Sequence, residues 1–183
     1  MTVTTERPPD VLPHRRAPHR LRPHGNQMPT AECLLIGAMV WTVLDIARVL
    51  VGLVDVDDFE EAGHRTIWQA ITSLVQRGIQ PTGAVLNGEL MRAGELSGDR
   101  GKIVVRKLMD AVTSGANDLA PQPYAEAVVA ASYRRRLHSA GVSLAEFSET
   151  LPESDLMPIL TTFGVAARDH ERRLTALRGG GNA

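Results

Sequence analysis

The sequence predicts an all-α protein: a globule of five or six helices followed by a long antiparallel helical hairpin. Hydrophobic residues make up 43% of the 183 residues and aromatic residues only 4%. The apolar side chains are mainly Ala, Leu and Val, of which Ala and Leu are strong helix formers. Apolar residues recur at intervals of three and four, and few segments alternate apolar and polar residues as strands do. Composition and spacing therefore both favour helix.

The globule is expected to begin at Met28. Thr30 is a good N-cap residue, and Glu32 follows where the positive end of a helix favours an acid. The apolar spacing then predicts a first helix to about Trp41 and a second over residues 43–54.

Three further helices complete the predicted globule. The first of them covers residues 64–77. Thr82 is expected to cap the next one, which ends at Gly94. Ser97 or Asp99 can cap the last, whose apolar residues keep helical spacing.

The last third of the chain has a different character. Residues 124–150 contain no proline and only one glycine, and a helix of that length reaches about 40 Å at 1.5 Å per residue. Pro152 should end it, and a second long helix is predicted over residues 155–178, with Pro158 tolerated in the first turn. Two long helices joined by a few residues form an antiparallel hairpin.

The predicted hairpin has more apolar seam than it can bury alone. Its first helix keeps a four-three rhythm at Tyr124, Val128, Ala131, His138, Val142 and Ala145. The residues expected to form an oligomer seam are Tyr124, Val128, Leu156, Leu160, Phe163 and Leu174. Self-association would cover such a seam, and so would folding of the hairpin back onto the globule, because both produce the same pattern.

Composition divides the chain into four parts: a basic Pro/His/Arg-rich tail at 1–27, a helical globular subdomain at 28–119, a hairpin at 120–178 and a flexible tail at 179–183. The chain carries a formal net charge of -1, but its first 27 residues hold five arginines against two acids. A basic arm of this kind can contact nucleic-acid backbone or an acidic partner. It can equally be a tail without a role. The candidate nucleic-acid contacts are Arg15, Arg16, Arg20 and Arg22.

The sequence offers no catalytic constellation. Residues 98–102 hint at a phosphate-binding loop, but Leu96 stands where its first glycine belongs and Ile103 where its Ser or Thr belongs. Nucleotide hydrolysis is therefore excluded for this segment. No nucleophile has a recognisable supporting motif, so we expect neither an enzyme nor a cofactor.

Metal binding and membrane insertion are not expected either. Cys33 is the single cysteine, so no intramolecular disulfide or multi-cysteine zinc site can form. Glu61 and His64 could share a helix face, but a di-iron site needs a second such pair. Without a long apolar run or a signal-peptide core, the protein is expected to be cytoplasmic.

Three consecutive arginines lie in the middle of the first long helix, at Arg134, Arg135 and Arg136. The first and the last point about 200° apart at 3.6 residues per turn, so the three cannot share one narrow face. They form either a solvated surface or a partner face that contacts an acidic patch or phosphate.

Several short motifs follow one another in a fixed order. They are Pro29-Thr30-Ala31-Glu32, Leu35-x-Gly37-x-Met39, Asp58-Phe59, His64-Arg65-x-Ile67-Trp68-x-Ala70-Ile71, Gly78-x-x-Pro81, Ala116-Asn117 and Pro123-Tyr124-Ala125. In this order and spacing, over about residues 29–150, the sequence resembles the N-terminal domain of replicative, DnaB-type DNA helicases. It departs from the usual family pattern at Cys33, Thr82 and Val104-Val105.

The resemblance implies a module that builds a collar through hairpin-mediated dimers and docks primase on its surface. The linker and ATPase domain that unwind DNA in that family have no counterpart in the 183 residues. The helicase-binding domain of primase has a similar globule and hairpin, so that identity is an alternative.

Three functions stay open from the sequence. The first is a non-catalytic DNA-replication module that forms a dimer or higher homo-oligomer and engages replicative helicase or primase. The second is a nucleic-acid-binding accessory protein that uses its basic arm. The third is a structural homo-oligomer that competes with helicase assembly.

Overall fold

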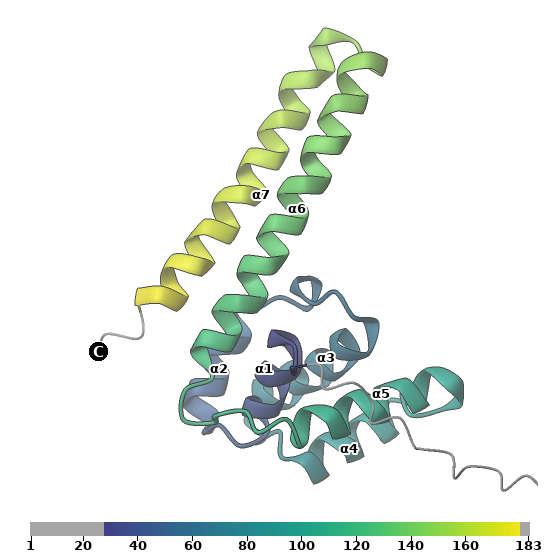
Figure 1. Ribbon diagram of the computed structural model, residues 1–183, viewed down its shortest axis with the longest axis vertical. Helices are drawn as coiled ribbons and strands as arrows, with labels where there is room; N and C mark the ends of the chain where they lie inside the picture. The colour runs from purple at the N-terminus through teal and green to yellow at the C-terminus, as the bar shows by residue number, and fades with distance from the viewer. Residues whose placement is uncertain (1–27, 180–183) are drawn as a thin grey trace, which may run out of the picture.

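The computed structural model describes residues 28–179. Their secondary structure consists of seven α-helices and one short 3-10 helix, with no strand. Helices α1 to α5 form the globule, and α6 and α7 rise from it as a hairpin (Figure 1). The all-α prediction is confirmed. The elements are α1 (Ala31–Met39), α2 (Leu44–Leu53), η1 (Val56–Asp58), α3 (Ala62–Gln76), α4 (Gly83–Arg92), α5 (Gly98–Val112), α6 (Gln122–Thr150) and α7 (Glu153–Gly179).

Helix α1 begins where the sequence predicts and lies at the centre of the globule. The Thr30 hydroxyl accepts a hydrogen bond from the Cys33 amide at 3.2 Å and so caps the helix. Helix α5 packs against α1 at Gly37, because a Cβ there would overlap the carbonyl oxygen of Ala111. Thr82 and Ser97 occupy the predicted N-cap positions of α4 and α5, but their side chains make no capping hydrogen bond.

The core of the globule is built around two aromatic rings. Phe59 and Trp68 are fully buried, with ring centroids 5.1 Å apart. The indole N–H of Trp68 donates to the Val54 carbonyl oxygen at 3.2 Å, which fixes the end of α2 against α3. The first turns of α6 close the core with Val128 and Val129, and the last turns of α7 add Leu174 and Leu177.

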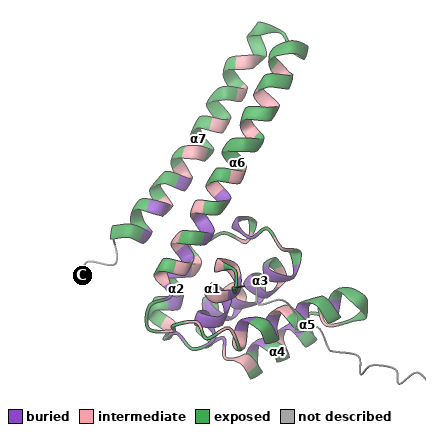
Figure 2. Ribbon diagram, in the orientation of Figure 1, coloured by how far each residue is buried: buried purple, intermediate pink, exposed green. Residues whose placement is uncertain are grey.

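The hairpin has the predicted antiparallel form, and only Leu151 and Pro152 join its two helices. Its lower part packs on the globule, whereas its upper part is mostly exposed (Figure 2). Helix α7 begins at Glu153, two residues earlier than predicted, so Pro158 lies inside the helix in its second turn rather than in its first.

Part of the predicted seam of α6 is not covered within the described part of the chain, since Ala131, His138, Val142 and Ala145 are all exposed. The stripe that begins at Tyr124 and Val128 follows the side of α6 that meets the globule. The globule ends near Ser132, the last buried residue of the helix, so the continued stripe faces solvent. Beyond that point α6 turns a different face to α7. The residues of that face are Tyr133, Ala140, Ser143, Leu144 and Phe147.

Candidate functional site

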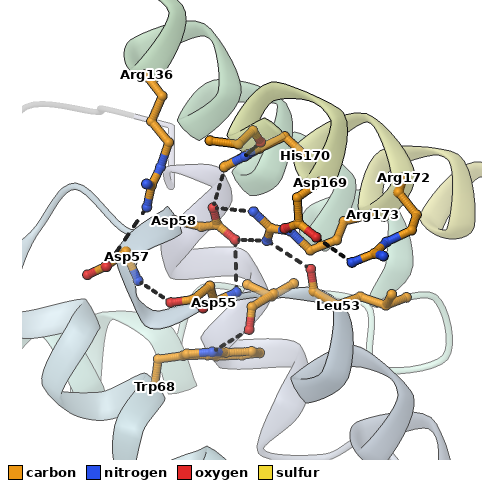
Figure 3. A network of polar contacts seen from close by, with 12 residues as sticks. Leu53, Asp55, Asp57, Asp58, Trp68, Arg136, Asp169, His170, Arg172 and Arg173 are labelled. Carbon is orange, nitrogen blue, oxygen red and sulfur yellow. Dashed lines mark hydrogen bonds and ion pairs between the residues drawn. The ribbon is translucent and has the colours of Figure 1, made fainter. Parts of the chain in front are cut away.

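A buried carboxylate joins the hairpin to the globule. Asp58, at the end of η1, is 0% exposed and accepts a hydrogen bond from the Asp55 amide at 2.8 Å. Arg173 of α7 donates to both carboxylate oxygens of Asp58, and one of these bonds measures 3.3 Å. The His170 Nε2 atom lies 3.4 Å from one of the same oxygens. Figure 3 shows these groups converging from η1 and α7.

The charge of Asp58 is retained despite its burial. Burial by itself would raise the pKa of the Asp58 carboxyl, but the hydrogen bonds from Arg173 and from the Asp55 amide hold it below its usual value. Arg173 also donates to the Leu53 carbonyl oxygen at 3.1 Å and pairs with Asp169 at 3.3 Å. One guanidinium therefore ties α7 to the end of α2 and to η1.

The arginine triplet of α6 is divided between two roles. Arg135 donates to the Asp58 carbonyl oxygen at 2.6 Å, and Arg136 lies 3.9 Å from the carboxylate of Asp57. Both residues contact η1 of their own chain, and the partner face at the triplet stays a prediction. Arg134 is exposed and has no ion-pair partner among residues 28–179.

A second carboxylate, the half-buried Glu32, holds the starts of α1 and α3 together. Glu32 accepts from the Glu60 amide at 2.6 Å and contacts the His64 Nδ1 atom at 2.8 Å. Burial raises the pKa of Glu32, whereas His64 and the two backbone amides of Glu60 and Glu61 lower it, and the net effect is a lowered pKa. The sequence indicated a helix-terminus role for Glu32 but carried no signal for the contact with His64.

The predicted oligomer seam coincides largely with contacts inside the chain. Val128 and Leu174 are buried in the core, and Tyr124 is half-buried, with its hydroxyl accepting from the Asn117 amide at 3.2 Å. Leu156 and Phe163 are half-buried on the face of α7 that meets α6. Val128 and Leu174 are therefore removed as oligomer contacts. Only Leu160 of the six predicted residues is exposed, at 48%.

A groove of about 440 Å³ runs between the two hairpin helices above the globule. Small side chains line it, among them Ser139 and Ala140 of α6 and Ala166 and Ala167 of α7, together with the ring of Phe163. Tyr133 and His170 stack at its lower end, with ring centroids 5.7 Å apart.

The outer part of the hairpin exposes large apolar side chains in addition to this groove. At 100° per residue, Leu160 lies on the opposite flank of α7 from Thr162, which lines the groove. Leu160 is nevertheless only about 20° from Ala167 around α7, and Ala167 and Leu137 both line the groove, so Leu160 lies beside the groove. The exposed large apolar residues of the hairpin are Leu137, Val142, Met157, Leu160 and Val165.

The remaining predicted sites have no arrangement that supports chemistry. Residues 98–102 form the first turn of α5 and not a loop. Between residues 28 and 179 no group of three or more His, Cys, Asp or Glu side chains could hold a metal ion. Cys33 is buried, and this burial raises the pKa of its thiol. The arm residues Arg15, Arg16, Arg20 and Arg22 lie outside the described residues.

None of the helices in the described part of the chain combines the length and the apolar character that crossing a membrane requires.

The architecture, a small helical globule that carries a helical hairpin, is matched by known proteins. The family model described as the DnaB-like helicase N terminal domain matches residues 24–129. Because this match covers more than half of the chain, the protein belongs to that family. No curated protein matches the sequence.

A solved structure agrees in fold. The crystal structure of the N-terminal domain of DnaB helicase from Mycobacterium tuberculosis superposes with a TM-score of 0.65 at 20% sequence identity. The similarity covers 77% of this chain and 99% of that one. The domain that this family describes is the non-catalytic collar domain of the helicase, so the family assigns the chain a helicase-associated, non-catalytic role.

Proposed function

We propose that the chain is an interaction module of DNA replication that self-associates through the exposed apolar residues of its hairpin and docks replicative helicase or primase. The main observation behind this proposal concerns the outer part of the hairpin. It extends beyond the globule and exposes Leu160, Met157 and Val165. Three exposed large apolar side chains within nine residues of α7 favour an interaction surface on this part of the hairpin. Family membership supports assembly in the context of a helicase.

Leu160→Asp tests the self-association, because this residue is exposed and its substitution leaves the contact between α6 and α7 intact. Light scattering coupled to gel filtration should show a dimer or larger species for the wild type and a smaller species for Leu160→Asp. Thr161→Asp is the matched control, since Thr161 is an exposed neighbour that points about 100° away. A wild type that stays monomeric at about 100 μM would remove the hairpin proposal.

A further inference from the structure

One face of α6 continues beyond the globule, and nothing in the described part of the chain covers it. Ala131, His138, Val142, Ala145 and Glu149 fall within a sector of about 60° at 100° per residue. All five are exposed, and Figure 2 shows the upper part of α6 as mostly exposed. We call this face the α6 stripe. It combines small, polar and apolar side chains, of which Val142 is 57% exposed.

The α6 stripe ends at an acidic tip of the hairpin. Residues 139–167 contain no basic residue. Within residues 28–179 no ion-pair partner approaches any acid of this segment, whereas most acids of the globule have such a partner. The tip therefore presents four negative charges without compensation. They belong to Glu146, Glu149, Glu153 and Asp155, all of them exposed.

The opposite end of the α6 stripe lies where the described chain begins. Thr30 and Ala31 line a small cavity of about 190 Å³ together with Ala131 and Arg135 of α6. Residues 1–27 therefore join the globule beside Ala131, which we call the foot of the stripe. A segment attached at this point can reach the acidic tip by following α6.

The sequence of this segment is complementary in charge to the acidic tip. Residues 11–27 contain four arginines and no acid. Opposite charges favour the docking of one surface on another. Attachment to the globule also raises the effective concentration of the segment to roughly the millimolar range. A contact that would be weak between separate molecules is then sufficient to hold the segment in place.

The lengths of the two elements agree. Glu146 and Glu149 lie about 22 and 27 Å beyond the foot of the stripe at 1.5 Å per residue. In a proline-rich, extended chain at about 3.1 Å per residue, Arg22 and Arg20 lie about 25 and 31 Å from Thr30. The two sets differ by about 4 Å or less, a distance that a long arginine side chain spans.

We propose that residues 16–27 dock along the α6 stripe, with two arginines at the acidic tip. The arginines are Arg20 and Arg22, and their partners are Glu146 and Glu149. The segment contains two prolines, which suit this contact because proline favours an extended chain and has no N–H group to desolvate.

Other occupants fit the α6 stripe less well. Nucleic acid would bring its phosphates to an acidic tip, where they would meet negative charge instead of the cations that they need. A second copy docked tip to tip would set like charges opposite each other. The basic segment of this chain supplies cations within reach of the tip and carries neither cost.

The inference goes beyond the proposed self-association and does not rest on it, because it concerns contacts within one chain. It gives the basic segment an acidic partner in its own hairpin. Arginines that are paired with the tip are not free to bind phosphates. Binding of nucleic acid by this segment would then require its release from the stripe, at a cost in affinity.

Limited proteolysis of the full chain by trypsin tests the inference. Mass spectrometry measures the rates of cleavage after Arg16 and Arg20, both of which a docked segment protects. The variant Glu146→Gln/Glu149→Gln removes two charges of the tip and should be cut about fivefold faster than the wild type, since exposed ion pairs are individually weak. Circular dichroism should show equal helix content for both proteins, because the two acids are exposed.

Glu95→Gln/Glu171→Gln is the matched control, since it removes two exposed acids outside the tip. It should be cut at the wild-type rate. If the tip variant is also cut at that rate, the docked segment is refuted. An equal acceleration in the control would refute it as well, because the loss of any two negative charges would then be sufficient.

Protein concentration distinguishes a contact within the chain from one between copies. Protection within one chain should be the same at about 1 μM and about 100 μM, because the effective concentration of a tethered segment is fixed. Protection that increases with concentration would assign the segment to a neighbouring copy and overturn the inference. Light scattering on the same samples reports self-association separately, so that failure of either proposal is recognised by itself.

Discussion

Arg173 and Asp58 form a buried ion pair that joins the last helix of the chain to a turn 115 residues earlier. The Asp58 side chain is 0% exposed and that of Arg173 only 12%. Few other groups could neutralise the carboxylate if the guanidinium were removed, since His170 approaches only to 3.4 Å. This pair therefore adds a buried polar tie to the apolar contacts that hold the hairpin to the globule.

Arg173→Met should lower the free energy of unfolding by about 3–5 kcal/mol, because it leaves a buried carboxylate without its partner. Urea titration followed by circular dichroism measures the loss. Arg172→Met is the control, since the Arg172 side chain is 80% exposed and pairs with Asp169 at the surface. That change should stay within about 0.5 kcal/mol. Equal losses in the two variants would contradict a special role for Arg173.

Stability should decrease at acid pH because of Asp58 and Glu32. Both carboxyls have a lowered pKa in the folded protein, so the unfolded chain binds protons more readily than the folded one. Their contribution is complete above the unfolded pKa values, about 4, and disappears as the pH falls through the lower folded values. Urea midpoints measured between pH 7 and pH 3 should therefore decrease below about pH 4.

The variant Glu32→Gln shows how much of this pH dependence comes from the Glu32 carboxyl. The amide oxygen of Gln can still accept from the Glu60 amide, but the side chain cannot ionise. The variant should be less stable than the wild type at pH 7 and should lose less stability on acidification. If wild type and variant lose stability in parallel down to pH 3, the Glu32 contact with His64 makes no pH-dependent contribution.

Gly37→Ala should destabilise the globule by about 1–3 kcal/mol, the usual cost of overpacking. The new methyl group would overlap the Ala111 carbonyl oxygen and lie 2.7 Å from the Ser114 hydroxyl. Gly88→Ala is the matched control within α4, where a Cβ meets nothing within 4 Å. It should stabilise by about 0.5–1 kcal/mol. Thermal unfolding of both variants measures the difference, and equal shifts would argue against close packing of α1 on α5.

Arg134→Glu should weaken docking of helicase or primase about tenfold, or about 1.4 kcal/mol, if the hairpin carries the partner face. Pull-down titration with both proteins from the same cell measures this loss. Arg106→Glu on α5 is the control, an equally drastic change at an exposed arginine of the globule. Unchanged binding by Arg134→Glu would count against a partner face at the exposed end of the arginine triplet.

The fold could be predicted from features that involve only residues close together in the sequence. Thr30 caps α1 as expected, and Pro152 separates the two long helices. Such features depend on neighbours in the sequence, where capping and helix-breaking chemistry operate.

The contacts of the candidate site residues were less predictable, because they join residues that lie far apart in the sequence. The four-three rhythm of α6 records a contact with the globule as far as Ser132 and cannot indicate where that contact ends. For this reason Val142 was expected in a seam and is exposed. Likewise, the residues near Arg135 in the sequence do not indicate its hydrogen bond to the carbonyl oxygen of Asp58, which lies 77 residues away.

The placement of Arg173 also has a consequence for biosynthesis. Ribosomes add about 5–20 residues per second, so the 115 residues that follow Asp58 take on the order of 10 s to emerge. During that interval the nascent globule lacks Leu174 and Leu177, which complete its core. Helix α6 then has an uncovered face without α7.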